Sequence, residues 1–266
     1  MELTILTDNT TRIDAYYLGE PGVSYYITDG EKHILFDTGY SDVYCRNAAS
    51  LGIDLSAVDA IVLSHGHNDH TRGLLFFPPT ERKIPIYAHP EVFSPKRDGE
   101  EDIGMPMSTA EAEERFELHL SREPVQLTEH LTYLGQIPRT VPFENRHPVG
   151  ERLVKGEWGP DFMPDDTALV YRGEDGLTVI TGCSHAGICN IVEYAKKLCG
   201  DDRIAGIIGG FHMLAMTPRV TKTVEYLKAL QPKRLCPCHC TNFHARAAIH
   251  AAVPVEEVCV GDCLKL

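Results

Sequence analysis

A short run of histidine and aspartate residues holds the clearest chemical potential in this chain. In Ser64-His65-Gly66-His67-Asn68-Asp69-His70, the first two histidines are two residues apart, and Gly66 allows the sharp turn that lets both imidazoles face one metal ion. Asp69 and His70 begin the following helical segment and can face a second ion. Neutral imidazoles and carboxylates, three or more per site, are the usual ligands of divalent metals. The spacing predicts a metal centre, and the alternative is a polar loop with incidental histidines.

Three more histidines follow apolar segments that are expected to be strands. They are His185 after Leu177–Thr181, His212 after Ile204–Ile208, and His239 after Arg234-Leu235. In layered α/β folds, the ends of strands and the loops after them gather at one edge, which carries the chemistry. These distant histidines are therefore expected to join the first cluster.

The elements that must position these residues alternate between strands and helices, which indicates an α/β (α+β) fold. Besides those named, predicted strands cover residues 3–6, 23–27, 33–36, 60–63, 84–88, 131–134 and 168–171, and predicted helices cover 42–51, 109–120, 188–199, 220–230 and 241–251. We expect one domain over 1–266. A polar and charged insertion or lid, with one helix as its predicted element, covers about 91–160.

Composition excludes several classes of protein. The 266 residues carry a net charge of −13, which disfavours a general nucleic-acid binder, and no apolar run is long enough for a membrane span. The N-terminus is typical of a strand and not of a signal peptide. Nine cysteines without an export signal indicate reduced thiols and a cytoplasmic protein. We expect a small-molecule substrate and no nucleic-acid or membrane partner. The sequence does not indicate an oligomeric state.

The segment Cys236-Pro237-Cys238-His239-Cys240 also suggests a structural zinc site, which would need four converging ligands. Successive side chains of a strand point to opposite faces, so these five residues are not expected to converge on one ion. We favour thiols in the core with His239 alone facing the site.

These motifs together resemble the metallo-β-lactamase superfamily. Phe36-Asp37-Thr38-Gly39 matches its early turn, Ser64 to His70 matches its signature, and His239 matches its last ligand. The resemblance implies a four-layer αββα sandwich with metals at the sheet edge, bound by His65, His67, Asp69, His70, His185 and His239. It also implies that Asp37 orients a ligand histidine and that Asp8 lines the edge of the site, both outside the ligand set.

Within that superfamily the chain is similar to the dihydropterin-6-methyl-(ribofuranosyl)aminobenzene-phosphate synthases. The matching segments are Leu6–Asn9, Gly22–Ser24, Ser64–His67, Ile137–Arg139, Gly182–Ile188, Gly209–His212 and His239–Thr241.

The chain departs from the common superfamily plan at two positions. Cys183 stands where many members carry an Asp that bridges two metals, and a further ligand position falls near Asp165-Asp166. His185 can restore a ligand, and Cys183 is either a thiolate ligand or a buried structural cysteine. One or two divalent ions are therefore expected. Zinc is the first expectation, and iron and manganese also suit these ligands.

The predicted reaction is hydrolysis of a small phosphorylated or pterin-like substrate by a metal-activated water. The alternative is a transferase that condenses a dihydropterin diphosphate with an arylamine ribofuranosyl phosphate and releases pyrophosphate. Asp69 and His212 are the catalytic candidates, and His212 can also ligate metal or contact substrate. Arg139 is the expected binder of an anionic group, and the other cations available are Lys96, Arg97, Arg146 and His147.

Three other classes fit less well. The charge disfavours a nuclease of the same superfamily. A di-iron oxidoreductase of this fold would carry Glu at position 67 and a flavin domain. A non-catalytic metal-containing binding module would show a closed four-ligand site.

Overall fold

The computed structural model describes residues 1–144 and 147–266, so Arg146 lies outside the described residues. Within what we predicted as one domain, the residues group into two compact units. The first unit contains residues 1–122, 147–165 and 259–265, and the second contains 123–146, 166–258 and 266. Each unit is described by itself.

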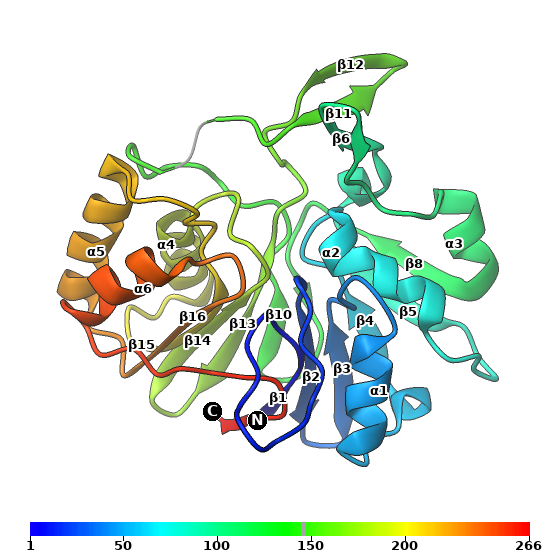
Figure 1. Cartoon of the computed structure of the whole chain (residues 1–266), viewed down its shortest axis with the longest axis horizontal. Coiled ribbons are helices and arrows are strands. Elements are labelled where there is room, and N and C mark those ends of the chain that lie inside the picture. Colours follow the sequence, from blue (N-terminus) through cyan, green and yellow to red (C-terminus); the bar gives the residue numbers. More distant parts are fainter. Residues whose placement is uncertain (145–146) are drawn as a thin grey trace. The chain divides into compact units, whose positions relative to one another are not determined.

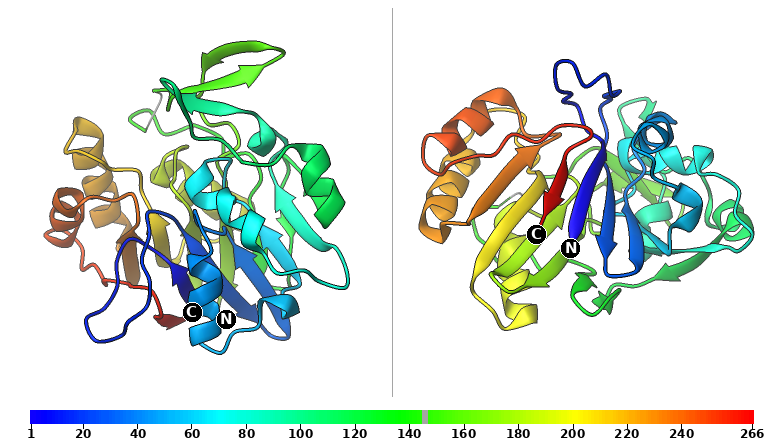
Figure 2. Two further views of the ribbon diagram at one scale, coloured as in Figure 1. Left: turned by 45° about the vertical axis from the view of Figure 1, so that its right-hand side comes forward. Right: turned by 90° about the horizontal axis from the view of Figure 1, so that it is seen from below.

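The first unit is built on a seven-stranded sheet in the order β17-β1-β2-β3-β4-β5-β8. Its strands are β1 (Glu2–Thr7), β2 (Ser24–Asp29), β3 (Lys32–Phe36), β4 (Ala60–Val62), β5 (Ile84–Ala88), β8 (Phe116–Leu120) and β17 (Cys263–Lys265). The C-terminal strand pairs with the N-terminal one, as Figure 2 shows. Strands β3, β4, β5 and β8 run parallel, so their carboxyl ends meet at one edge.

Helices pack on this sheet through a core in which Leu35, Tyr44, Ile61 and Leu63 are buried. The helical elements of the first unit are α1 (Val43–Ser50), α2 (Asn68–Thr71), α3 (Thr109–Arg115) and the 3₁₀ turns η1 (Leu55–Ala57), η2 (Arg72–Phe76) and η3 (Pro90–Phe93). A capping box between Ser108 and Glu111 starts α3. Helix α2 starts directly at the histidine motif, which places Asp69 and His70 in its single turn.

The middle of the chain differs from the predicted helical insertion. A small four-stranded sheet forms there, in the order β12-β11-β6-β7. Its strands are β6 (Lys96–Asp98), β7 (Glu101–Asp102), β11 (Glu151–Val154) and β12 (Glu157–Pro160). The helix predicted over 109–120 was wrong in its second half, because residues 116–120 pair with β5 in the large sheet. Tertiary pairing therefore overrides the helical propensity of the Glu-rich run.

The second unit has a six-stranded sheet in the order β16-β15-β14-β13-β10-β9 (Figure 1). Its elements are β9 (Val125–Gln126), β10 (Leu131–Tyr133), β13 (Ala168–Gly173), β14 (Gly176–Thr181), α4 (Ile188–Cys199), β15 (Ile204–Gly210), α5 (Pro218–Leu230), β16 (Arg234–Cys238) and α6 (Phe243–His250). Strands β14, β15 and β16 are parallel neighbours.

The apolar runs of β14 and β15 are buried, as expected of parallel strands covered by helices. Residues of the strands and of α4, α5 and α6 share one core, which includes Val179, Ile191, Ile207, Leu227 and Ile249. Among the residues described in both units, no helix is long and apolar enough to cross a lipid bilayer.

Candidate metal centre

Three imidazoles of the histidine motif cluster at the carboxyl end of β4. The rings of His65 and His67 have centroids 4.8 Å apart, and those of His65 and His70 are 4.2 Å apart. The His65 Nε2 atom lies 3.2 Å from His67 Nδ1, and the His70 Nε2 atom lies 3.5 Å from a carboxylate oxygen of Asp69. The loop from His65 to His67 and the single turn of α2 thus bring together the four predicted ligands of the first unit.

Asp37, at the end of the neighbouring strand β3, orients two of these rings. One carboxylate oxygen accepts from His70 Nδ1 at 2.7 Å and from Ser64 Oγ at 2.7 Å. The Ser64 hydroxyl also lies 2.8 Å from His65 Nδ1. A carboxylate only accepts, so His70 carries its proton on Nδ1, and Ser64 gives its single proton to Asp37 and accepts from His65 Nδ1. With Nδ1 protonated, the neutral form of each histidine presents the lone pair of Nε2, as a metal-binding imidazole must.

The donor set suits a divalent ion. A tetrahedral zinc with Zn–N bonds of about 2.0–2.1 Å holds two ligand nitrogens about 3.3 Å apart, and the observed His65–His67 separation is 3.2 Å. Burial lowers the pKa of His67 to about 4, while the Asp69 carboxylate acts in the opposite direction. The ring is therefore neutral near pH 7, as ligation requires.

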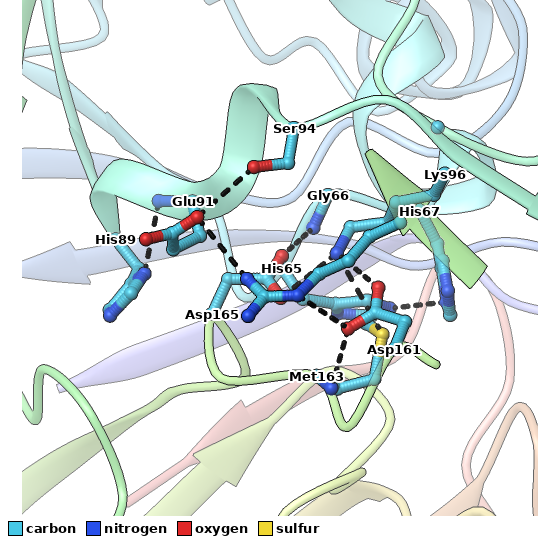
Figure 3. A network of polar contacts seen from close by, with 12 residues as sticks. His65, Gly66, His67, His89, Glu91, Ser94, Lys96, Asp161, Met163 and Asp165 are labelled. Carbon is cyan, nitrogen blue, oxygen red and sulfur yellow. Dashed lines mark hydrogen bonds and ion pairs between the residues drawn. The ribbon is translucent and has the colours of Figure 1, made fainter. Parts of the chain in front are cut away.

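A buried charge network supports the turn between His65 and His67. The Gly66 N–H donates to Asp165 Oδ2 at 2.8 Å, and the other oxygen of Asp165 lies 3.1 Å from Lys96 Nζ. The same ammonium donates to Asp161 at 2.7 Å. Burial alone would lower the pKa of Lys96, but the charges of Asp165 and Asp161 raise it above its ordinary value. Figure 3 shows this network beside the histidine turn.

In the second unit, the three predicted histidines follow three adjacent parallel strands. His185, His212 and His239 come after β14, β15 and β16, whose carboxyl ends lie at one edge of the sheet. The His185 and His212 rings are 4.3 Å apart. His185 is buried, whereas His212 and His239 are half-buried. Within this unit, two of the three strand-end histidines thus lie in contact, and their joining of the first cluster stays a prediction.

Several residues that follow strands, in both units, adopt unusual backbone conformations. Asp37, Ser184, His212 and His239 all have positive φ, between 47° and 57°. Non-glycine residues rarely adopt this left-handed region, and such strain concentrates at functional sites. Each of these residues belongs to or adjoins a motif singled out in the sequence.

The cysteines of the second unit have different surroundings. The Sγ atom of Cys183 and a ring nitrogen of His239 lie within 4.8 Å of each other. Cys240 Sγ accepts from the His212 N–H at 3.2 Å. Cys236 and Cys238 are buried in β16. Thus Cys183 is placed where a thiolate ligand could contribute, while the Cys236 and Cys238 thiols belong to the core.

The predicted substrate-binding cations have different surroundings. Arg139 is half-buried, and the next two backbone N–H groups, of Thr140 and Val141, donate to Asn190 Oδ1 at 2.8 and 2.7 Å, which anchors this segment on α4. Lys96 is buried between two aspartates, so it cannot meet a phosphate as we had considered.

Three other residues considered near the site have the following surroundings. Arg97 pairs with Glu151 at 2.8 Å and stacks on Trp158. His147 is exposed. Asp8 is buried and accepts from Thr10 N–H at 3.0 Å, so it shapes its own turn.

Sequence reasoning missed the supporting residues Ser64, Asp161 and Arg219. Arg219 of α5 donates to the His212 carbonyl and lies 3.6 Å from the buried carboxylate of Glu144. Each has a partner that is distant in sequence, namely Asp37, Lys96 and Glu144, so spacing alone gives no signal for these contacts. The available signal is the pair Asp165-Asp166, which the sequence indicates only as a ligand position.

Comparison with known proteins finds one family whose model covers most of the chain. The family model described as the metallo-beta-lactamase superfamily matches residues 18–239, from before the first histidine to the last predicted ligand. The chain is 31% identical over 262 residues to the 7,8-dihydropterin-6-methyl-4-(beta-D-ribofuranosyl)-aminobenzene-5'-phosphate synthase of Methanocaldococcus jannaschii, covering 92% of this chain and 89% of the relative. An uncharacterized protein of the same organism is 33% identical over 250 residues, covering 91% of each.

A solved structure is similar over the whole chain. The crystal structure of a metal-dependent hydrolase of the beta-lactamase superfamily superimposes with a TM-score of 0.87 at 29% identity, covering 100% of this chain and 99% of that one. The predicted fold class is thereby confirmed.

Proposed function

Because the chain belongs to the metallo-β-lactamase superfamily, we propose that it is a divalent-metal hydrolase that acts on a small phosphorylated or pterin-like substrate. The observation that carries this proposal is the group of three buried imidazoles and one partly exposed carboxylate after β4. We assign His65, His67, Asp69 and His70 as ligands, together with His185 and His239, which the same family match includes. Zinc suits this donor set best.

The chemistry follows from the chain's own groups. A bound divalent ion would lower the pKa of a water molecule to about 7 and polarise a phosphate oxygen. In the proposed reaction the water attacks phosphorus, a P–O bond breaks, and the leaving oxygen takes a proton. Asp69 accepts the proton of the attacking water, and His212 carries the proton for the leaving group, since imidazole titrates near neutral pH.

We assign the anionic end of the substrate to Arg139. The half-buried guanidinium is held on a segment anchored to α4, and a guanidinium binds phosphate oxygens through paired hydrogen bonds. Replacement of Arg139 by Ala is expected to lower kcat/KM by roughly tenfold or more, the loss typical of a charged hydrogen bond. The exposed Arg172 of β13 provides the control variant, Arg172→Ala. Unchanged turnover of a phosphorylated substrate by the Arg139 variant would refute this assignment.

A second candidate function has a specific observation in its favour, the 31% identity to a pterin-linked synthase. In that reaction, the C–O bond between a dihydropterin methylene and its diphosphate breaks. A C–N bond to an arylamine forms, and the amine loses a proton. The same site would then stabilise the leaving pyrophosphate.

One experiment separates the two reactions. Zinc-loaded protein is incubated with a dihydropterin diphosphate, with and without an arylamine ribofuranosyl phosphate. Release of inorganic phosphate that does not depend on the amine supports the hydrolase. Pyrophosphate release that requires the amine supports the transferase. If neither product forms with the metal-loaded protein, this substrate class is wrong.

A further inference from the structure

Lys96 is a buried cation in the first unit that the proposed reaction does not use. Its side chain is fully buried, and its ammonium group lies 2.7 Å from Asp161 and 3.1 Å from Asp165, both themselves fully buried. A buried lysine is costly unless its charge is matched, and here the two buried carboxylates match it.

The network reaches the metal-ligand turn through Asp165. One oxygen of this carboxylate contacts Lys96, and the other accepts the Gly66 N–H at 2.8 Å. Gly66 separates the ligands His65 and His67. The position of that amide therefore affects the spacing of the two ligand rings, and Lys96 holds the carboxylate whose other oxygen accepts the amide N–H.

Lys96 also packs directly against the turn. A Cβ atom on Gly66 would lie 3.0 Å from Lys96 Cε and 2.3 Å from the Val92 carbonyl oxygen. The lysine stem and the 3₁₀ turn η3 thus close one side of the ligand turn, as Figure 3 shows. No space remains for the turn to relax toward the lysine.

The remaining contacts connect Lys96 to the small sheet. Lys96 lies on β6 and pairs with Arg152 of β11. The Arg152 guanidinium lies 3.8 Å from Asp161 and 3.2 Å from Glu91. Asp161 follows β12 and also accepts the Met163 N–H at 2.7 Å. Glu91 also pairs with Arg122 at 2.6 Å. The three cations Lys96, Arg152 and Arg122 thus balance the three carboxylates of Asp161, Asp165 and Glu91, and the cluster has no net charge.

We propose that Lys96 is a positioning residue that holds the His65–Gly66–His67 turn in its ligand geometry through Asp165, so that the small sheet of the middle segment controls metal affinity. The inference rests on the proposed metal centre. It assigns to the middle segment a role in building the site, in addition to any role in covering it. Groups that orient metal ligands commonly change affinity by one to two orders of magnitude when removed.

The test compares Lys96→Met with Arg97→Met. Both replace a cation on β6 by an apolar side chain, but Arg97 pairs with Glu151 and stacks on Trp158, away from the ligand turn. Zinc affinity is measured by competition with a chromophoric chelator. The expected result is a loss of roughly 10-fold to 100-fold for Lys96→Met and no change for Arg97→Met. Wild-type affinity in Lys96→Met, or an equal loss in Arg97→Met, would overturn the inference.

A second measurement needs no metal. Amide hydrogen exchange of the metal-free protein is followed for Gly66 and for strands β13 and β14. We expect faster exchange at Gly66 in Lys96→Met, with unchanged exchange in the two strands, because the acceptor of this amide has lost its anchor. Unchanged exchange at Gly66 would contradict the positioning role. If the wild-type protein binds no zinc, the metal-centre proposal fails, and the exchange result still decides the inference.

The single variant leaves two buried carboxylates with one cation fewer, and it could fail to fold. The double variant Lys96→Met/Asp161→Asn removes one charge of each sign and keeps the net charge of the cluster. It keeps Asp165 as the acceptor for Gly66. We expect it to fold and to show weakened zinc binding. Folding with wild-type affinity would overturn the proposal.

Discussion

The carboxylate of Asp37 lies 2.7 Å from His70 Nδ1, and both side chains are completely buried. The two residues are 33 positions apart in sequence: Asp37 follows β3, and His70 lies in α2, the helix that comes after the neighbouring parallel strand β4. This contact fixes the tautomer of one proposed ligand, and through Ser64 the same carboxylate fixes the orientation of His65. Asp37 therefore prepares two ligand nitrogens at once.

Replacement of Asp37 by Asn is expected to lower zinc affinity by roughly 10-fold to 100-fold, because an amide cannot accept from both partners in the same way. Competition with a chromophoric chelator measures this loss. Asp59→Asn is the matched control. Asp59 accepts from the His33 N–H at the other end of β3, where it has no connection with the ligands. Equal affinities of the two variants would show that Asp37 does not orient the site.

A methyl group at position 66 is expected to destabilise the protein. The Cβ of Gly66→Ala would lie 2.3 Å from the Val92 carbonyl oxygen, so the turn or η3 must shift. Overpacking of this kind costs about 1–3 kcal/mol in the free energy of unfolding. Chemical denaturation checks this, with Gly159→Ala as control, since no atom lies within 4 Å of the corresponding Cβ. Identical denaturation midpoints for the two variants would contradict the packing described.

Arg219 is predicted to stabilise the second unit through Glu144. The buried carboxylate of Glu144 accepts the Cys189 N–H at 2.8 Å and has Arg219 as its nearby cation at 3.6 Å. Removal of one partner of a buried pair costs about 3 kcal/mol or more, so Arg219→Met should be clearly less stable than wild type. Lys222→Met, on the exposed side of the same helix, should denature like wild type. A stable Arg219→Met variant would mean that Glu144 is satisfied without this arginine.

Cys189 is expected to resist alkylation. Burial, with the neighbouring Glu144 charge, raises the pKa of the Cys189 thiol far above its ordinary value. The thiolate is the reactive form, so labelling by iodoacetamide at pH 8 should be on the order of 100-fold slower than at the exposed Cys263. Mass spectrometry of the labelled peptides gives both rates.

The raised pKa of the Cys189 thiol makes the stability of the protein depend on pH. The pKa of Cys189 is higher in the folded chain than in the unfolded one. Below the unfolded value of about 8.5 the thiol is protonated in both states and has no effect, and stability falls as the pH rises above it. Rapid labelling of Cys189 at pH 8 in the folded protein would contradict its burial.

Sequence alone predicts the strands that carry the chemistry. The apolar runs before His65, His185 and His212 are buried strands, and α4 covers the predicted residues 188–199. These elements follow from hydrophobic pattern and from glycine or proline boundaries. The grouping of the four proposed ligands of the first unit also follows from spacing, because a two-residue turn and one helical turn are local structures.

Long-range pairing limits what the sequence can predict. Residues 116–120 form a strand because β5 lies beside them, although the preceding Glu-rich run favours a helix. Strands β6 and β11 are polar and short, so they lack the alternation that identifies a strand. Lys96 meets Asp161 and Asp165 across 65 and 69 residues, and such a contact has no signature in composition or period.

In the proposed function, the histidine motif binds a catalytic divalent metal. The metal content of purified, zinc-reconstituted protein, measured by inductively coupled plasma mass spectrometry, tests it most directly. The comparison is between wild type, His65→Ala/His67→Ala, and the control His119→Ala/His130→Ala, which replaces two exposed histidines of the chain. We expect stoichiometric zinc in the wild type and the control and loss of zinc in the motif variant. Full zinc content in the motif variant, or no bound zinc in wild type, would contradict it.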